Sequence, residues 1–407
     1  MNINSGSGQV TIGGATNVSG DILLTSSNTA NAISGDISGS TAITYVGTAN
    51  TGHLTLSGNN SQTGTITVTS GTMNANSANA FGTGAVSVGS SGKIDLQYSG
   101  TVALGSTLNI DSGGSITNTV NTSSLSVAGI STLAGNITTA GNQLYSGAMT
   151  LSGGDRTLQG NAITANGITG STNGLTIFAS AVFNGSVTQV GNLYVSGTTN
   201  LGADISTSGY QSFEGAVTLA QSLTTLTTSG TGSSGVVSFS TVNGDTANTQ
   251  SLAVVAAGGI RFVGIVGGTA SLLNLSATGP SIIFENITTG GTQTYTGNVT
   301  IAKSSSAAIL KSTGTGASGN IQFGSNINGS SNPESLTLNT AGAISIAGAV
   351  GNTIPFRTLT ITNSGGATFT GLVRTTSSVM LSDTSGVITF SSGVVTSTLT
   401  TAAKAYD

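Results

Sequence analysis

Residues 291–302 read GTQTYTGNVTIA, and two close variants occur at 209–220 (GYQSFEGAVTLA) and 141–152 (GNQLYSGAMTLS). Each copy has a glycine, a glutamine two positions later, an aromatic residue two further on, a second glycine and an apolar-Thr-apolar ending. Apolar and small polar residues alternate in this ending, with the period of two that gives a β-strand one buried face. The motif therefore predicts short strands separated by glycine corners.

The composition predicts a folded chain with almost no charge. Glycine accounts for 62 of 407 residues, about twice its usual share of roughly 7%. Charged residues make up 5% of the chain, whereas soluble domains have about 25%. Disorder requires low hydrophobicity and high charge, but here the hydrophobic fraction is 36% and the mean hydropathy is +0.25. Solubility must therefore come from hydroxyl and amide groups.

Strand patterns continue along the whole chain. Alternating segments include TITVT at 65–69 and TLTIT at 358–362, and the three prolines leave the ladders largely uninterrupted. The most apolar stretch, Ser251–Gly268, is rich in glycine, contains Arg261 and is marginal in length for a membrane helix. We interpret it as two neighbouring strands, and we predict an all-β protein.

The motif belongs to longer repeats. Gln211 and Gln293 are 82 positions apart (293 − 211), and TGSSGVVSF at 231–239 matches TGASGNIQF at 315–323 with an offset of 84 (315 − 231). The first copy is closer, because Gln143 precedes Gln211 by 68 positions (211 − 143). A repeat of this length, built only from strand-sized pieces, contains several turns of a smaller unit.

Two architectures fit short strands every ~10–12 residues: a sandwich of hairpins, or a solenoid whose coil holds two or three strands. Asn-Gly pairs favour hairpin turns; they occur at 166–167, 173–174, 184–185, 243–244 and 328–329. A sandwich closes after a few strands, however, whereas this pattern does not stop. We predict a parallel β-helix (β-solenoid), an elongated rod whose coils stack ~4.8 Å apart.

Two regions resemble known families. Residues 54–96 (LTLSGNNSQTGTITVTSGTMNANSANAFGTGAVSVGSSGKIDL) resemble the passenger-associated β-strand repeat of bacterial autotransporters, with its LxLxGxNxxxG opening, TxVxxGTL-like middle and A-[LF]-GTGxVxV close. The matching residues are Leu56, Gly58, Asn60, Gly64, Thr65, Val68, Gly71, Thr72, Ala80, Phe81, Gly82, Gly84 and Val86. Met73 stands where the repeat usually has leucine. Residues 138–373 are similar to repeats of filamentous-haemagglutinin-like surface proteins, in which Q-[TS]-Y-x-G-x-V-T-L phrases recur.

The resemblance implies a right-handed parallel β-helix that is exported across the outer membrane and displayed outside the cell. The family's secretion cap and membrane barrel have no visible counterpart, so we expect a fragment of a larger protein or a relative exported by another route. We divide the one continuous solenoid as follows: N-terminal coils at 1–50, the autotransporter-type region at 51–137, a short haemagglutinin-like copy at 138–206, further copies at 207–290 and 291–373, and terminal coils or an edge at 374–407.

The repeated positions are the candidate functional residues, and we expect their role to be structural. They are Gln143, Tyr145 and Gly147 in the first copy, Gln211, Phe213 and Gly215 in the second, and Gln293, Tyr295 and Gly297 in the third. We expect the glycines Gly291 and Gly297 at corners, and Gln293 and Thr300 in polar rows. The aromatics could form a stripe that binds sugars, but they share a strand face with Val217 and Val299, which favours a core position.

Residues with catalytic or metal-binding chemistry are scarce. His53 is the one histidine, so no pair of histidines can bind a metal, and a Ser-His-Asp relay has no second histidine to use. We expect His53 to be a solvated turn residue. The twelve acidic residues share no repeat position, whereas a glycosidase needs two carboxylates facing one cleft. The fragments Gly153–Asp155 and Asp111–Gly114 only partly resemble calcium repeats and are expected to be turns. We predict no catalytic residue, no cofactor and no metal site.

The charge pattern also excludes a nucleic-acid partner, because eight basic residues in a chain of net charge −4 form no basic patch. Asp155, Arg156, Lys303 and Lys311 are expected to be surface charges. The chain has no cysteine, so it has no disulfides, and we expect no membrane insertion in this segment.

These observations predict a non-enzymatic extracellular protein of the bacterial cell surface, the β-solenoid stalk of an adhesin whose partners are glycans or proteins of the host or cell surface. The alternative is a subunit that assembles with itself, end to end or laterally, into an extracellular filament, sheath or surface layer. A tailspike-like polysaccharide-processing enzyme is a third hypothesis.

Overall fold

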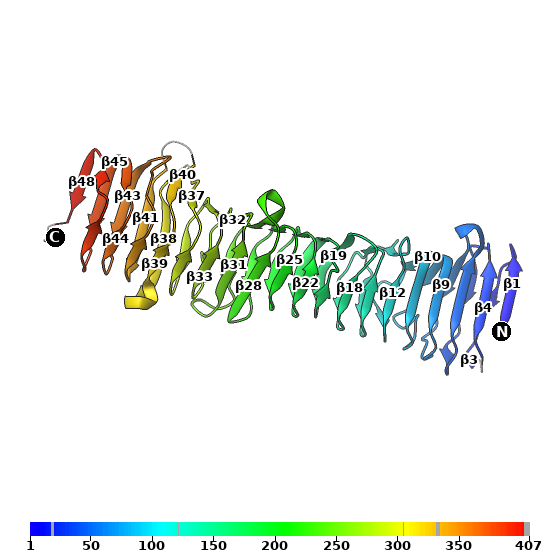
Figure 1. Ribbon diagram of the computed structural model, residues 1–407. Helices are drawn as coiled ribbons and strands as arrows, with labels where there is room; N and C mark the ends of the chain where they lie inside the picture. Colours follow the sequence, from blue (N-terminus) through cyan, green and yellow to red (C-terminus); the bar gives the residue numbers. More distant parts are fainter. Residues whose placement is uncertain (18–19, 121, 304, 331–333, 403–407) are drawn as a thin grey trace. The chain divides into compact units, whose positions relative to one another are not determined.

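The computed structural model describes residues 1–17, 20–120, 122–303, 305–330 and 334–402 (Figure 1). The chain forms two compact units, here called the N-terminal unit (Met1–Gly197) and the C-terminal unit (Thr198–Asp407). Strands make up 53% of the chain, which is a β-solenoid of about 19 turns. The described residues contain no α-helix; their helical segments are three short 3₁₀ turns, η1 (Thr48–Asn50), η2 (Gly232–Gly235) and η3 (Gly316–Gly319).

Three ladders of parallel strands build the N-terminal unit. Ladder A contains β1 (Asn2–Gly6), β4 (Ile22–Ser26), β7 (Ile43–Gly47), β9 (Ile66–Ala75), β10 (Val86–Leu96), β12 (Leu108–Ile110), β15 (Ser131–Leu133), β18 (Met149–Leu151), β20 (Ile168–Thr169) and β22 (Val187–Val190). Ladder B contains β2 (Thr11–Ile12), β5 (Asn31–Ile33), β8 (His53–Leu56), the second halves of β9 and β10, β13 (Ser115–Asn118), β16 (Ile137–Thr138), β19 (Arg156–Ala165), β21 (Leu175–Phe183) and β23 (Leu193–Val195). Ladder C contains β11 (Thr101–Leu104), β14 (Ser124–Val127), β17 (Gln143–Tyr145) and the second halves of β19 and β21, while β3 (Thr16–Asn17) and β6 (Ile37–Ser38) form a separate pair.

Three ladders of parallel strands also build the C-terminal unit. Ladder D contains β25 (Ile205–Thr207), β28 (Leu223–Thr228), β31 (Ser251–Ala256), β33 (Leu275–Thr278), β36 (Gln293–Tyr295), β39 (Ile321–Phe323), β42 (Ile344–Ile346), β44 (Ala367–Phe369) and β46 (Ile388–Phe390). Ladder E contains β26 (Gln211–Phe213), β29 (Val236–Phe239), β32 (Gly259–Phe262), β34 (Ser281–Ile283), β37 (Val299–Ile301) and β40 (Ile327–Gly329). Ladder F contains β24 (Thr199–Leu201), β27 (Val217–Leu219), β30 (Val242–Gly244), β35 (Ile287–Thr289), β38 (Ala308–Thr315), β41 (Leu336–Ala341), β43 (Phe356–Thr362), β45 (Val373–Ser382), β47 (Val394–Val395) and β48 (Thr398–Thr401), with Val266 bridging β30 and β35.

The parallel pairing confirms the predicted β-solenoid and rejects the sandwich of hairpins. Partners in adjacent coils are separated by 18 positions where Gln143 pairs with Leu125, and by 28 where Ile321 pairs with Gln293. The Asn-Gly pairs do not make hairpins; two of them, at 243–244 and 328–329, lie inside the parallel strands β30 and β40. Asn and Gly instead suit the tight corners of a coil, because both tolerate left-handed backbone conformations.

The period of two predicted from the sequence places the core. In β37, Val299 and Ile301 are 1% and 0% exposed, and Thr300 between them faces outward, as expected. Inward residues of successive coils stack directly, and the rings of Phe213, Phe239 and Phe262 lie nearly parallel with centroids 5.7 Å apart at each step. Stacked apolar columns of this kind bury surface continuously from coil to coil, which is the main stabilising term in a solenoid.

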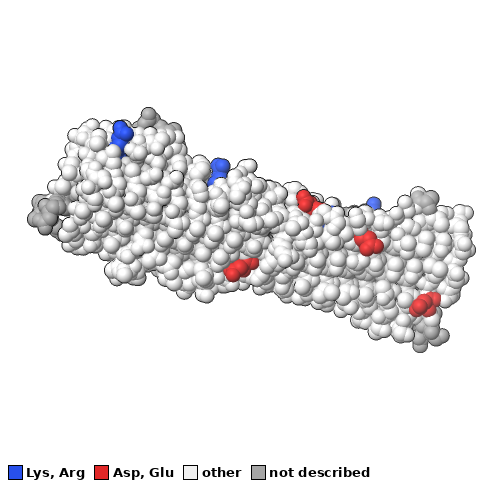
Figure 2. Space-filling view, in the orientation of Figure 1, with Lys and Arg blue, Asp and Glu red and all other residues white. Residues whose placement is uncertain are grey.

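The apolar stretch at 251–268 forms β31 and β32, which confirms the prediction of two strands. Arg261 faces outward from β32, with its guanidinium 5.4 Å from the centroid of the Phe284 ring. The outward faces are otherwise nearly uncharged, and Figure 2 shows only a few separated charged residues on one side of the molecule.

The second and third copies of the motif occupy different ladders of the C-terminal unit. Gln211 lies in β26 of ladder E, whereas Gln293 lies in β36 of ladder D. Each copy covers two short strands and the corners around them, so the 82-residue offset is not a whole number of turns. The motif encodes a corner and its flanking strands, which any two consecutive ladders can accommodate.

Candidate functional site

The repeated glutamines lie inside the solenoid and hydrogen-bond to the corner before them. In the first copy, Gln143 donates from Nε2 to Thr139 Oγ1 (3.2 Å) and to the carbonyl of Gln159 in the next coil (2.7 Å). Thr139 in turn donates to the Gly141 carbonyl (2.9 Å), and the Tyr145 hydroxyl donates to Gln143 Oε1 (2.8 Å). We call this group of threonine, glutamine and aromatic residue the buried corner unit.

The third copy repeats these contacts. Gln293 Nε2 donates to Thr289 Oγ1 (3.3 Å) and to the Lys311 carbonyl (2.8 Å), and the Tyr295 hydroxyl donates to Gln293 Oε1 (3.1 Å). Thr289 donates to the Gly291 carbonyl (2.7 Å). The agreement between the copies shows that the motif conserves a set of hydrogen bonds within one chain, rather than only a strand pattern.

The second copy has the same geometry with one bond missing. Gln211 donates to Thr207 Oγ1 (3.1 Å) and to the Thr227 carbonyl (2.9 Å), as its counterparts do. The aromatic residue is Phe213, which has no hydroxyl, and Gln211 Oε1 is buried with no hydrogen-bond partner. A buried acceptor without a donor is destabilising, so this copy is the weakest of the three.

The prediction that Gln293 lies in a polar row is wrong, because its side chain faces the core and not the outside of the coil. Gln143, Gln211 and Gln293 are all 0% exposed, because a residue two positions before an inward aromatic must share its face. The sequence signal for this is the threonine four positions earlier, which gives the pattern T-x-G-x-Q-x-[YF] in all three copies. Such a threonine can satisfy a buried amide locally.

The aromatics are core residues, as predicted, so they cannot form a stripe that binds sugars. Tyr145 and Tyr295 are 0% exposed and Phe213 is 1% exposed. Burial raises the pKa of the Tyr145 and Tyr295 hydroxyls far above the ordinary value of a phenol, since the phenolate would lose its hydration. These tyrosines remain neutral hydrogen-bond donors at any physiological pH.

The motif's second glycine lies where adjacent coils approach closely. A Cβ on Gly297 would be 2.3 Å from the backbone of Gly279, and a Cβ on Gly147 would be 2.3 Å from that of Gly129. These distances are far below van der Waals contact, so only glycine fits. The predicted corners at Gly291 and Gly297 are confirmed, since both residues lie between consecutive strands.

Several aspartates bind the next coil. Each of three accepts a backbone N–H there: Asp36 from Asn59 (2.7 Å), Asp155 from Gly174 (2.6 Å) and Asp204 from Thr225 (2.8 Å). Asparagines do the same elsewhere, as Asn320 does for Ala343 (2.9 Å). Because Asp and Asn occupy the same role, the side-chain oxygen acts as a hydrogen-bond acceptor, and the negative charge of the aspartate is not needed for it.

Other residues singled out in the sequence also have structural positions. His53 is the first residue of β8 and partly buried, which corrects the expected solvated turn. The fragments at Gly153–Asp155 and Asp111–Gly114 are a bend and a turn, as predicted. Arg156 is not simply a surface charge, because it donates to the Gly154 carbonyl (3.0 Å) and the Gly153 carbonyl (3.1 Å). Within the described ranges, no three His, Asp or Glu side chains are grouped closely enough to hold a metal ion.

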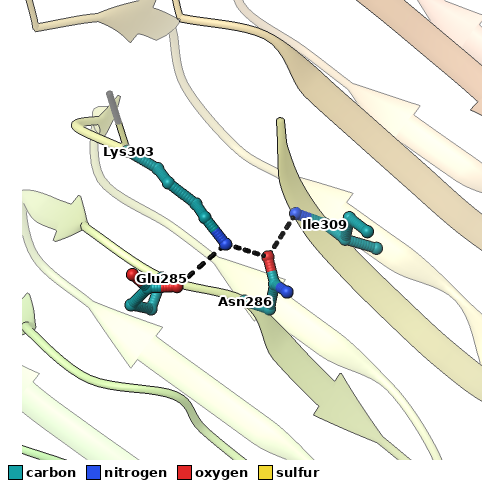
Figure 3. Close-up of polar contacts among 4 residues, drawn as sticks. All are labelled: Glu285, Asn286, Lys303 and Ile309. Atoms are coloured by element: carbon teal, nitrogen blue, oxygen red, sulfur yellow. Dashed lines mark hydrogen bonds and ion pairs between the residues drawn. The ribbon is translucent and has the colours of Figure 1, made fainter. Parts of the chain in front are cut away.

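One corner of ladder F in the C-terminal unit is different, because it is charged. Lys303, expected to be a surface charge, is only 9% exposed and forms an ion pair with Glu285 (2.8 Å). Its Nζ also donates to Asn286 Oδ1 (3.0 Å), which accepts the backbone N–H of Ile309 at the same distance (Figure 3). The lysine is buried because acceptors from the preceding coil surround its ammonium group.

A cavity of about 250 Å³ opens beside this ion pair. Its lining residues come from the turns before β38 and β41 and from the start of β43: Lys303, Ser305, Ser306, Ala307, Glu334, Ser335 and Arg357. Glu334 is 4% exposed and accepts a hydrogen bond from the Ser330 hydroxyl (2.7 Å). We call this the charged cavity, and no local sequence pattern marks it because its residues are spread over 55 positions (303 to 357).

Comparison with known proteins gives no relatives: no family model, no curated protein and no solved structure matches the chain. The resemblance to autotransporter and haemagglutinin-like repeats therefore stays a prediction. None of the described helical segments is long and apolar enough to span a membrane.

Proposed function

We propose that the protein is a non-enzymatic scaffold, the stalk of a bacterial surface adhesin that acts outside the cell. The observation that supports it best is the buried corner unit. Residues that would be candidates for binding in another protein, Gln293 and Tyr295 among them, are used to hold consecutive coils together. Aspartates that would be candidates for catalysis accept backbone N–H groups in the same way.

The low charge supports the same function. Coil stacking through backbone hydrogen bonds and apolar columns depends little on ionic strength, since screening acts on charges. A surface stalk meets variable salt and proteases, and dense backbone pairing leaves few sites for local unfolding. The partners in this proposal are glycans or proteins of the host or cell surface.

A second candidate function is lateral self-assembly, which one row of side chains favours. Along ladder A, eight consecutive outward positions carry only hydroxyl or amide groups: Thr44, Thr67, Ser87, Asn109, Thr132, Thr150, Thr169 and Thr188. The equivalent rows of ladders B and C are interrupted by Asp95 and Leu144 respectively. A regular uncharged row could pack against the same row of another copy.

Three experiments test these proposals. Antibodies against the chain should label intact cells of the source organism as strongly as permeabilised cells; labelling only after permeabilisation would contradict the surface stalk. Negative-stain microscopy of purified protein should show discrete particles, whereas ordered fibres or sheets would favour the assembly subunit. Release of oligosaccharide from polysaccharides, abolished by replacing one acidic residue, would instead support the enzyme hypothesis.

A further inference from the structure

The buried ammonium of Lys303 lies against the side-chain amide of Asn286. Lys303 is 9% exposed, and within the described ranges it is the one basic residue among the buried side chains. Its Nζ lies 2.8 Å from Glu285 Oε2 and 3.0 Å from Asn286 Oδ1 (Figure 3). Because a carbonyl bond is ~1.23 Å long, the contact to Oδ1 places Nζ within about 4.2 Å of Asn286 Cγ. This is close to the separation of about 3–3.5 Å between reacting atoms in a near-attack geometry.

The Asn286 amide presents its oxygen to the lysine and is held in that orientation. Its Oδ1 also accepts the backbone N–H of Ile309 at 3.0 Å. Both neighbours of this atom are hydrogen-bond donors, so the oxygen of the amide, and not its nitrogen, must face them. If an amine attacks Cγ, negative charge develops on Oδ1, and the Ile309 N–H is in place to stabilise it as an oxyanion hole does.

Glu285 is placed to move protons in such a reaction. Its carboxylate contacts Nζ directly, so it can take the proton that the ammonium must lose before the amine acts as a nucleophile. The Glu285 side chain is 37% exposed, and water therefore still solvates the carboxylate once the lysine has reacted. Lys303 also lines the charged cavity, which gives a departing ammonia molecule room to leave.

Coil stacking does not require the lysine. Other asparagines accept a backbone N–H of the next coil, as Asn320 does from Ala343 (2.9 Å) and Asn326 from Ala349 (2.8 Å), and neither bonds to a lysine or arginine in the described part of the chain. Burying a charged ammonium is unfavourable unless it is well partnered. A reaction that turns this ammonium into a neutral amide explains why Lys303 is buried here.

We propose that Lys303 and Asn286 form an isopeptide cross-link, an amide bond between Nζ and Cγ. Glu285 takes one proton from the Lys303 ammonium, and the freed lone pair of the amine forms the Nζ–Cγ bond. The bond between Cγ and the amide nitrogen of Asn286 then breaks. That nitrogen leaves as an ammonium ion with the two protons that Nζ has lost, one of them by way of Glu285, which ends as the carboxylate it was.

The cross-link needs no oxidant, reductant or activated co-reactant, because one amide is exchanged for another. It ties together two coils of the C-terminal unit: Asn286 directly precedes β35, and Lys303 lies in the segment that leads to β38, the next strand of ladder F. By closing a loop over residues 286–303 it constrains the unfolded chain as a disulfide does, in a protein that has no cysteine. The cross-link goes beyond the scaffold function, since it depends neither on where the protein acts nor on what it binds.

The test is the intact mass of the purified full chain, followed by peptide mapping with trypsin. We expect the folded protein to be lighter than its sequence by one molecule of ammonia. Trypsin cleaves after lysine and arginine, and an amide on Lys303 blocks cleavage there, so residues 262–311 should be recovered as one peptide that carries the whole loss. The five Asn-Gly pairs, which can also lose ammonia by ring closure, all lie outside this peptide.

Three substitutions assign the reaction to its residues. Lys303→Arg keeps the positive charge but removes the amine, and Asn286→Asp keeps an acceptor for the Ile309 N–H but removes the amide; each should abolish the loss of ammonia. Glu285→Gln should slow the reaction by about 100-fold or more, so that chains without the cross-link are recovered. Lys311→Arg is the matched control, because it makes the same change at an exposed residue of β38, and the loss of ammonia should persist.

A folded chain with the full mass of its sequence would overturn the proposal, as would a loss of ammonia that persists in Lys303→Arg. Loss of water instead of ammonia would place the bond between Lys303 and Glu285 and would overturn it too. If a variant does not fold, the wild-type map still decides, since fragmentation of the 262–311 peptide identifies the joined residues. These outcomes are independent of cell-surface labelling and of particle shape, so the cross-link and the scaffold function can fail separately.

Discussion

The substitution Phe213→Tyr should stabilise the protein, although it adds a polar group to a tightly packed core. Gln211 Oε1 is buried without a donor, and the other two copies show which donor is missing. There, a tyrosine hydroxyl reaches the equivalent oxygen at 2.8 Å from Tyr145 and at 3.1 Å from Tyr295. The new hydroxyl would therefore enter a position that the same backbone motif already accommodates twice.

The expected magnitude follows from the cost of an unpaired acceptor. A typical net hydrogen bond contributes about 1 kcal/mol to the free energy of unfolding, and an unsatisfied buried group costs about 1–3 kcal/mol. We expect Phe213→Tyr to raise the free energy of unfolding by about 1 kcal/mol. The reverse substitution, Tyr295→Phe, leaves Gln293 Oε1 without its donor and should lower it by about 1–3 kcal/mol.

Native-state hydrogen exchange is the appropriate assay, because a long repeat array can unfold in parts and a single global midpoint would mix them. A stabilisation of about 1 kcal/mol slows exchange of the β26 and β29 amides by about fivefold. The control is Phe239→Tyr, in the same aromatic stack one coil further, where the residue two positions earlier is Val237 and offers no acceptor. That variant should be destabilised by about 1–3 kcal/mol. If Phe213→Tyr and Phe239→Tyr are equally destabilising, the buried corner unit is not a hydrogen-bonded unit.

Three further predictions concern pH, close packing and the acidic residues. Burial raises the folded-state pKa of Tyr145 and Tyr295, so their stabilisation is present below pH about 10 and is lost as the pH rises above it, by up to about 1.4 kcal/mol per pH unit for each tyrosine. In the Tyr145→Phe, Tyr295→Phe double variant, the free energy of unfolding should therefore fall less steeply with rising pH than in the wild type. Equal slopes of this free energy against pH in the two proteins would contradict the burial. Gly297→Ala should destabilise by about 1–3 kcal/mol through backbone overlap, whereas Gly13→Ala, whose new Cβ meets nothing nearer than 3.8 Å, should have the wild-type melting temperature; a tolerant Gly297 would refute the close approach. Asp204→Asn keeps the acceptor for the Thr225 backbone N–H and should melt at the wild-type temperature, while Asp204→Ala should lower the free energy of unfolding by about 1 kcal/mol. Equal melting temperatures of the two variants would show that the Asp204 hydrogen bond to the next coil does not stabilise the protein.

Much of the fold could be predicted from the sequence because its signals are local. The alternation in Val299–Ile301 gives inward and outward positions directly, and the glycines on either side of Gln293 and Tyr295 mark the corners. Register could not be predicted in the same way. Coil length varies, as the separations of 18 and 28 residues between ladder partners show, so small insertions at corners change which residues become neighbours.

The features that the sequence did not predict all depend on that register or on a buried polar partner. The motif predicts a polar row for Gln293, but the residue is buried, and its burial makes sense only with Thr289 and the Lys311 carbonyl in place. Lys303 was expected at the surface because its partner, Glu285, lies 18 positions earlier and in the preceding coil. The charged cavity combines three successive coils, and no local pattern marks it.

The stacking of coils in parallel is the central claim, and an engineered disulfide tests it directly because the native chain has no cysteine. Thr132 and Thr150 face outward as partners in adjacent coils of ladder A, and Thr169 lies one coil further. Adjacent parallel strands are ~4.8 Å apart, within the Cα separation of about 4.4–6.8 Å that a disulfide spans, whereas two coils are too far apart. We predict that the Thr132→Cys, Thr150→Cys variant forms a disulfide on mild oxidation without loss of thermal stability, and that the Thr132→Cys, Thr169→Cys variant does not. Absence of the first disulfide, or equal formation of the second, would contradict the β-solenoid.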